Sequence, residues 1–166
     1  MIRRAPVAVL SLSAAALVGL LAHEGYSDRA ILPIEGDRPT VGFGSTFRDD
    51  GSAVQMGDTI TPPKAVARTY AHIARDERGI KGCVTAPLTQ VEYDVMVDFS
   101  YQYGVQTLCA SSMVRHANAG RYVESCKSYL LYKRAAGRDC SNRANGCYGV
   151  WTRSLDRYQR CLGAQT

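Results

Sequence analysis

The first strong pattern along the chain is an apolar segment close to its N-terminus. After Arg3 and Arg4, residues 5–22 run for eighteen positions without a charged side chain. As a helix with a rise of about 1.5 Å per residue, this run just reaches across the hydrocarbon core of a bilayer. Half of its residues are Ala, Ser or Gly, so its drive into lipid is weak compared with a leucine-rich span.

The second half of the chain is a succession of amphipathic helix patterns. Apolar residues recur at steps of three and four over residues 85–103, which predicts a central helix. Its expected core positions are Leu88, Val91, Val95, Met96, Phe99 and Tyr103. Another helix is predicted from Thr61, as N-cap with proline in the first turn, to about Arg78. Shorter helices are predicted over 111–119, 123–132 and 151–162, with a loop over 134–149.

Between the apolar segment and these helices, the pattern predicts a β-hairpin. Residues 29–34 and 40–44 form its two short strands, and residues 35–39 form a tight turn rich in Gly and Pro. Glu24 stands at the end of the predicted N-terminal helix. A helix end that faces a hairpin turn can hold two carboxylates across a cleft, which is the geometry that glycoside hydrolysis needs.

The composition is that of an ordinary globular protein of one domain, with 46% hydrophobic and 21% charged residues. The net charge of +5 suits an anionic polymer, such as nucleic acid, an acidic membrane face or a carboxylate-rich cell wall. The sequence has no long Lys/Arg run and no nucleic-acid motif, so we expect no nucleic-acid partner.

The chain contains six cysteines, and none of them forms a Cys-x-x-Cys pair of the kind that holds zinc. Together with an exported N-terminus, they predict up to three disulfides formed in an oxidising compartment. Six cysteines allow fifteen pairings, and the close spacing of Cys140 and Cys147 favours a bridge between these two. The three histidines are scattered, so neither a metal nor an organic cofactor is expected.

Three segments of the sequence resemble the phage-type lysozymes of glycoside hydrolase family 24, in the order in which that family has them. They are Glu24-Gly-Tyr with Gly36-Asp-Arg-Pro-Thr-Val-Gly-Phe-Gly-Ser-Thr46, the central helix over residues 88–104, and the Arg-rich segment over residues 149–162. The resemblance implies an α+β lysozyme-like fold, with a small β-hairpin lobe, a larger helical lobe and the active-site cleft between them. It also implies a monomer that cleaves peptidoglycan between N-acetylmuramic acid and N-acetylglucosamine, with inversion at the anomeric carbon, for host-cell lysis.

The resemblance assigns Glu24 as the proton donor and Thr40 as the residue that orients the nucleophilic water. Gly42 and Gly44 are expected to let the backbone approach the sugar closely. Ser45 is expected to line the cleft, since family members often carry His near this position.

The second carboxylate departs from the family pattern. The position nine residues after the glutamate, where the family usually has Asp, is Pro33 here. Two acids remain nearby, Asp37 and Glu35, and we favour Asp37 because it stands three residues before Thr40. The remaining alternative is that neither acid acts and that Thr40 alone holds the water.

The apolar segment allows three interpretations: a cleaved signal peptide, a permanent anchor, or an anchor that leaves the membrane. It resembles the signal-anchor-release element of some phage endolysins, which we favour. Residues 1–22 would then be the releasable segment and the N-terminal helix of the released enzyme, with the catalytic domain over 23–166. Cleavage after Ala22 would leave Glu24 at a frayed terminus, a poor support for a catalytic acid.

This interpretation predicts an enzyme held at the host inner membrane, facing the periplasm, and soluble in the periplasm after release. While tethered, Glu24 lies at the lipid surface, away from its partners, and the enzyme is silent. The alternative from another class is a non-catalytic, membrane-tethered protein that binds peptidoglycan, for which the Pro33 departure is the only support.

Overall fold

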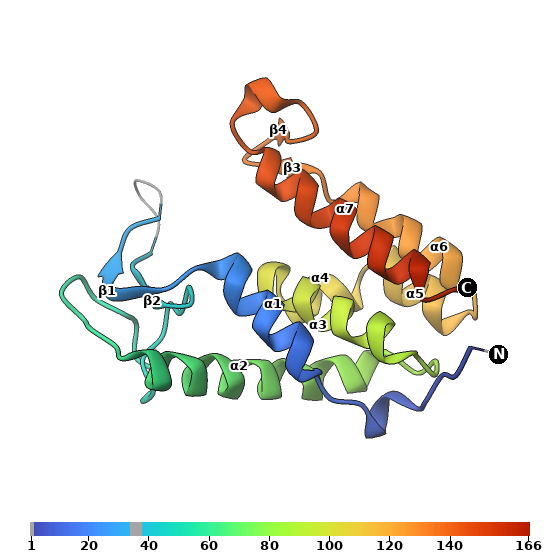
Figure 1. Cartoon of the computed structure of the whole chain (residues 1–166), viewed down its shortest axis with the longest axis horizontal. Helices are drawn as coiled ribbons and strands as arrows, with labels where there is room; N and C mark the ends of the chain where they lie inside the picture. The colour runs from blue at the N-terminus through green and yellow to red at the C-terminus, as the bar shows by residue number, and fades with distance from the viewer. Residues whose placement is uncertain (1, 34–37) are drawn as a thin grey trace. The chain divides into compact units, whose positions relative to one another are not determined.

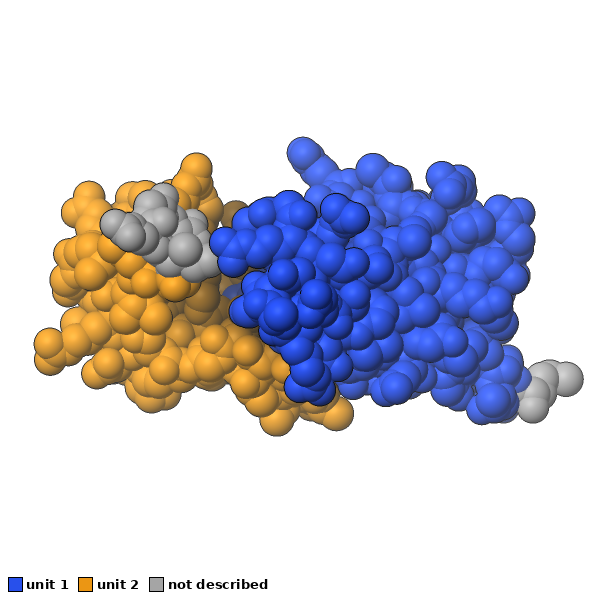
Figure 2. Space-filling model, turned by 90° about the horizontal axis from the view of Figure 1, so that it is seen from above, with its two compact units in different colours: residues 1–13, 76–166 blue, residues 14–75 orange. Residues whose placement is uncertain are grey.

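The computed structural model describes residues 2–33 and 38–166. The chain divides into two compact units, which Figure 2 colours separately. Residues 14–75 form the hairpin unit, and residues 1–13 together with 76–166 form the helical unit. The boundary between the units therefore falls inside the apolar segment, after Ser13. The domain boundary after residue 22 that the sequence predicts applies to the membrane-bound form, and it stays a prediction.

The hairpin unit contains the predicted β-hairpin. Its elements are α1 (Ala14–Glu24), β1 (Ser27–Ile31), β2 (Thr40–Gly42) and the first part of α2 (Pro62–Cys83). β1 and β2 are antiparallel, with Ser27 opposite Gly42 and Ile31 opposite Thr40. A small core lies behind the hairpin, made of Ala30, Val41, Val54, Ile60 and Ala65 with Phe43 packed against it. The hairpin is confirmed, but both of its strands end earlier than the sequence predicted.

The helical unit is built around α3 (Gln90–Tyr103), and α7 (Tyr148–Gly163) packs on α3 and α6 (Figure 1). Its other elements are η1 (Val7–Val9), the end of α2, α4 (Val105–Cys109), α5 (Ser112–Asn118), α6 (Tyr122–Lys127), η2 (Ser128–Leu131), β3 (Arg134–Ala135), β4 (Arg138–Asp139) and η3 (Arg143–Asn145). Phe99 is fully buried at its centre, with the rings of Tyr103, Tyr129 and Tyr132 around it.

The central helix begins five residues later than the prediction from residue 85. Thr89 is its N-cap: the Thr89 side chain accepts a hydrogen bond from the Glu92 amide, and the Glu92 side chain accepts one from the Thr89 amide. Val91 was expected in the core and is 38% exposed, so that prediction is wrong. Glu92 and Asp94 are buried instead.

The apolar segment is α-helical only over its second half, as α1, with the short 3-10 helix η1 before it, whereas the sequence predicted one helix through residues 5–22. Pro6 disfavours helical backbone at Ala5, which pairs with Leu88 in a β-bridge. The amides of Leu12 and Ser13 bond to side chains of the helical unit instead of to helical carbonyls. Across residues 2–33 and 38–166, no helix is both long and apolar enough to cross a bilayer.

All six cysteines are paired in disulfides, and all three bridges lie in the helical unit. Cys140–Cys147 is the pair that the sequence favoured, and it is confirmed. Cys83–Cys109 joins the end of α2 to the end of α4, and Cys126–Cys161 joins α6 to α7. These two pairings did not follow from the sequence, because they depend on which helices pack together.

Candidate active site

Glu24 is the last residue of α1, and its side chain is half-buried. The helix ends there because Gly25 adopts a left-handed backbone with φ of 68°. The Gly25 amide donates to the Leu21 carbonyl at 3.2 Å, which closes the final turn of the helix. Gly25 therefore turns the chain from α1 into β1 and fixes the direction in which the Glu24 side chain leaves the helix.

The Glu24 carboxylate lies against the tight turn that follows β2. Val41 and Ser45 exchange two backbone hydrogen bonds, of 3.0 and 3.1 Å, and so close this turn. Gly44 has φ of 77° within it, and a Cβ atom placed on Gly44 would lie 3.4 Å from Glu24 Oε2. The bare Gly44 backbone thus leaves room for the carboxylate, and the structure brings Glu24 and Gly44 together.

Gly42 has a structural reason of its own to be glycine. It is buried, with φ of 69°, and a Cβ atom there would lie 2.9 Å from the Ala65 Cβ. The end of β2 can pack directly on the first turns of α2 because no side chain intervenes. A contact of Gly42 with sugar stays a prediction.

Thr40 begins β2, half-buried and opposite Ile31. It is thus carried by the same short strand that leads into the turn holding Glu24. The two candidates for the second carboxylate, Asp37 and Glu35, lie outside the described residues. Their assignment stays a prediction.

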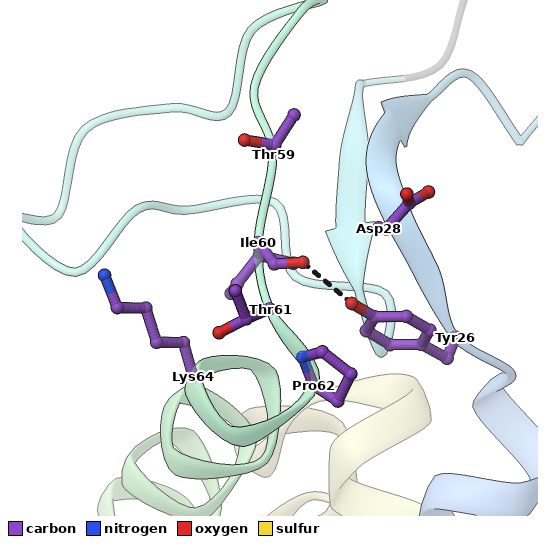
Figure 3. A pocket seen from close by; sticks show the side chains of 7 residues that line it. All are labelled: Tyr26, Asp28, Thr59, Ile60, Thr61, Pro62 and Lys64. Atoms are coloured by element: carbon purple, nitrogen blue, oxygen red, sulfur yellow. Dashed lines mark hydrogen bonds between the residues drawn. The ribbon is translucent and has the colours of Figure 1, made fainter.

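A cavity of about 460 Å³ opens beside the start of β1 (Figure 3). The Tyr26 hydroxyl donates to the Ile60 carbonyl at 2.7 Å, and the Tyr26 ring packs on Phe43 with centroids 5.4 Å apart. Desolvation and the nearby Asp28 carboxylate raise the pKa of Tyr26, so its hydroxyl stays a hydrogen-bond donor at neutral pH. Asp28 and Lys64 place opposite charges on the lining, which also includes Thr59, Thr61 and Pro62.

These lining residues were not singled out from the sequence. Tyr26 belongs to the Glu24-Gly-Tyr triplet on which the resemblance rests, so its position was a usable signal. Lys64 gave no signal. It comes to the same cavity as Asp28 only because residues 58–60, just before α2, pair with the free edge of β1 through Ala30 and Asp28.

A second depression, of about 330 Å³, carries acids that are unsuited to proton donation. Arg48 forms an ion pair with Asp58 at 2.7 Å, and Arg68 forms one with Asp49 at 2.6 Å. Hydrogen bonds from Arg48 and from the Gln55 amide hold the pKa of Asp58 at about 2. A carboxyl group that is ionised so strongly cannot act as a general acid near neutral pH.

No group of three or more His, Cys, Asp or Glu side chains in the described part of the chain is arranged to hold a metal ion. Among the described acids of the hairpin unit, Asp49 and Asp58 pair with arginines, and Asp50 accepts hydrogen bonds from Ser52. The chemistry that this site offers is therefore that of a half-buried glutamate beside a glycine turn.

Comparison with known proteins shows which family this chain resembles. The family model described as phage lysozyme matches residues 21–153. An endolysin of Salmonella phage P22 is 32% identical over 101 residues, which cover 61% of this chain and 68% of that protein. A protein described as a SAR-endolysin, from Escherichia phage 933W, is 31% identical over 131 residues, with 75% and 71% covered.

Solved structures agree with these sequence matches. A crystal structure of a P22 lysozyme mutant superposes with a TM-score of 0.76 at 26% identity, covering 93% of this chain and 99% of that one. An endolysin from Escherichia coli O157:H7 phage FAHEc1 has a TM-score of 0.79 at 24% identity, covering 93% and 94%, and shows the same fold. The α+β lysozyme-like fold predicted from the sequence is confirmed.

Proposed function

This chain belongs to the phage lysozyme family, and we propose that it hydrolyses the β-1,4 bond between N-acetylmuramic acid and N-acetylglucosamine in peptidoglycan. It is a glycoside hydrolase of the endolysin type, and peptidoglycan is the substrate of its family. The observation that carries the proposed reaction is the position of Glu24, at the end of α1 with its carboxylate against Gly44.

Glu24 is the proposed general acid. Cleavage of a glycosidic bond requires a proton for the leaving oxygen and a second group that activates water or stabilises the sugar cation. The turn over residues 41–45 leaves the Glu24 carboxylate beside exposed backbone, where a sugar ring can approach. Gly44 and Ser45 are the proposed contacts of that ring, together with Gly42.

Thr40 is proposed to orient the attacking water, with Asp37, or alternatively Glu35, as the second carboxylate. An inverting reaction needs the two carboxyl groups about 6.5–9.5 Å apart, so that a water fits between the base and the sugar. The stereochemistry of the product tests this assignment: proton NMR of the first-formed reducing end should show the α-anomer.

The central test is Glu24→Gln, which keeps the size of the side chain and removes the proton donor. We expect release of reducing ends from purified peptidoglycan to fall by on the order of 10³-fold, because general acid catalysis contributes this much. Glu124→Gln, on an exposed position of α6, is the matched control and should keep full activity. Full activity in Glu24→Gln would exclude the proposed mechanism.

We also propose that residues 1–22 anchor the enzyme in the host inner membrane and later leave it. Support comes from the SAR-endolysin relative and from the exposure of the apolar segment. In the folded protein, Val7 and Leu20 are buried, whereas Val9 is 73% and Val18 is 66% exposed. The soluble fold gains little from the last two side chains, while a bilayer would gain from both.

The intact mass of the active soluble species after lysis tests this route. A species that retains residues 1–22 supports release of an uncleaved anchor, and one that begins at His23 excludes it. Before release, the enzyme should sediment with the inner membrane and face the periplasm; after release, we expect a soluble monomer. The non-catalytic alternative has no support from the relatives, which are endolysins.

A further inference from the structure

We propose that the helical unit carries a capture site for the chain's own residues 4–13, and that filling this site completes the released enzyme. The inference rests on the proposed anchor release and adds a receptor for the released segment. The site is formed by Glu77, Leu88, Glu92, Asp94, Tyr122 and Gln165, and all of its contacts lie within the helical unit.

Arg4 is held at this site from three directions. Its guanidinium donates two hydrogen bonds to the Glu92 carboxylate, at 2.9 and 3.1 Å, in the planar geometry that only arginine provides. It also donates to Gln165 Oε1 at 2.6 Å and lies 3.6 Å above the centre of the Tyr122 ring. The Arg4 and Glu92 side chains are only 17% and 3% exposed, so this is a desolvated ion pair. Arg3, next to it, is exposed.

The backbone after Arg4 is bound in a form that excludes a continuous helix. Ala5 and Leu88 exchange two backbone hydrogen bonds, of 2.8 and 2.9 Å. The Leu12 amide donates to Glu77 Oε1 at 2.8 Å, and Ser13 donates to Asp94 through its amide at 3.0 Å and its hydroxyl at 2.7 Å. The amides of Ala5, Leu12 and Ser13 therefore donate to groups of the helical unit and not to carbonyls of a helix through residues 5–22.

A bilayer imposes a different structure on the same residues. In hydrocarbon each backbone amide needs a partner within the span, so residues 5–22 must be helical there. Arg3 and Arg4 then remain on the cytoplasmic side, while the helical unit is in the periplasm. Arg4 cannot reach Glu92 across the membrane, so the anchored and captured forms exclude each other. On release, residues 5–13 therefore change from a continuous helix to a chain that is helical only in the short 3-10 turn η1.

The empty capture site makes the tethered precursor less stable than the released enzyme. When the segment is in the membrane, Glu92 loses the ion pair with Arg4, and Asp94 loses two hydrogen bonds from Ser13. Both carboxylates keep other donors in the helical unit, so the stability that is lost is that of the ion pair and of these hydrogen bonds. The membrane-bound enzyme is then inactive for two reasons: Glu24 lies away from its partners, and the helical unit is incomplete.

Arg4→Gln tests this, with Arg3→Gln as its matched control. Both variants remove one positive charge before the apolar run, so they alter membrane orientation equally, but only Arg4 has partners in the folded enzyme. We expect the melting temperature of the purified soluble enzyme to fall by on the order of 5 °C in Arg4→Gln and to stay unchanged in Arg3→Gln. Arg4→Lys, which keeps the charge and loses the planar pair, should melt below the wild type as well.

The same variants are compared during release. After a protonophore collapses the membrane potential, the soluble fraction should fall severalfold in Arg4→Gln relative to Arg3→Gln. Equal melting temperatures in the two variants would overturn the capture site. A wild-type soluble species that lacks residues 1–22 would overturn anchor release as well. Loss of the proposed hydrolysis would show separately, as wild-type protein that releases no reducing ends from peptidoglycan.

Discussion

The disulfides and the proposed catalytic residues of this protein lie in different units. The helical unit contains all three disulfides and a buried charge cluster in which Arg157 and Arg153 both bond to Asp98. The hairpin unit, residues 14–75, contains no cysteine and rests on a small apolar core. Yet Glu24, Thr40 and Gly44 all belong to the hairpin unit.

The difference shows how the hairpin unit holds its residues in place without disulfides. Its geometry depends on glycines in left-handed conformations, Gly25, Gly42 and Gly44, and on the short turn between Val41 and Ser45. Such turns fix direction locally, whereas disulfides and buried ion pairs restrain segments that are distant in sequence. Substitutions in the two units should therefore separate loss of stability from loss of activity.

The largest stability effect is expected from Asp98→Asn in the helical unit. Burial acts to raise the pKa of Asp98, but Arg157 and Arg153 outweigh it and hold the pKa below its usual value. Removing the charge leaves the buried Arg157 guanidinium, and the half-buried Arg153 beside it, without the Asp98 carboxylate, at a cost of about 3–5 kcal/mol of unfolding free energy by denaturant titration.

The pH dependence of the unfolding free energy tests whether Asp98 stabilises the fold through its charge. Because the folded pKa of Asp98 is lowered, its stabilisation is fully present above the unfolded pKa of about 3.9 and is lost as the pH falls through the folded value. The wild type should thus lose more stability than Asp98→Asn does on acidification below about pH 4. An equal loss in both proteins would show that Asp98 does not act through its charge.

The next effect is expected from removal of the Cys126–Cys161 bridge by a double substitution to serine. The bridge closes a loop of 35 residues, and loop-closure entropy assigns it about 4 kcal/mol. The control is the double serine variant of Cys140–Cys147, whose separation of 7 residues corresponds to about 2 kcal/mol. Both variants should keep wild-type activity at 25 °C, since both bridges lie within the helical unit. A larger loss from the shorter loop would contradict the entropic explanation.

The smallest of these stability effects is expected from Gly42→Ala in the hairpin unit. The added Cβ meets Ala65 at 2.9 Å and sits at φ of 69°, so we expect a loss of about 1–3 kcal/mol. Gly19→Ala is the control, because a Cβ there meets no atom within 4 Å and its backbone is helical. That change should be neutral or stabilising by up to about 1 kcal/mol in thermal melts. If Gly42→Ala were as stable as Gly19→Ala, close packing would not explain Gly42.

Much of the fold could be predicted from local pattern. The hairpin followed from its Gly and Pro signals, and the long helices followed from apolar spacing. The start of α3 was missed although Thr89 and Glu92 spell a capping box, because the periodicity was extended backward through Pro87. The burial of Asp94 was not predictable locally, since its partner Ser13 lies 81 positions away in the sequence.

The proposed site residues could be named from the sequence, but their arrangement could not. Glu24, Thr40 and Gly44 came from the resemblance, and the structure adds the contact between Gly44 and the Glu24 carboxylate. That contact depends on how α1 and β2 come together, which no spacing rule gives. Tyr26, Asp28 and Lys64 line one cavity because the segment before α2 pairs with the outer edge of β1, which is also a non-local event.

If residues 1–22 anchor the enzyme in the membrane as proposed, the exposure of Val9 and Val18 allows the time of release to change without a change in the catalytic residues. Both side chains are exposed in the folded protein, so their hydrophobicity would act mainly on how long the proposed anchor stays in lipid. Polar residues at these positions would shorten that residence and bring lysis forward, and larger apolar ones would delay it. Under this proposal, selection on the time of lysis would act on Val9 and Val18, while selection on hydrolysis would act on the proposed general acid Glu24.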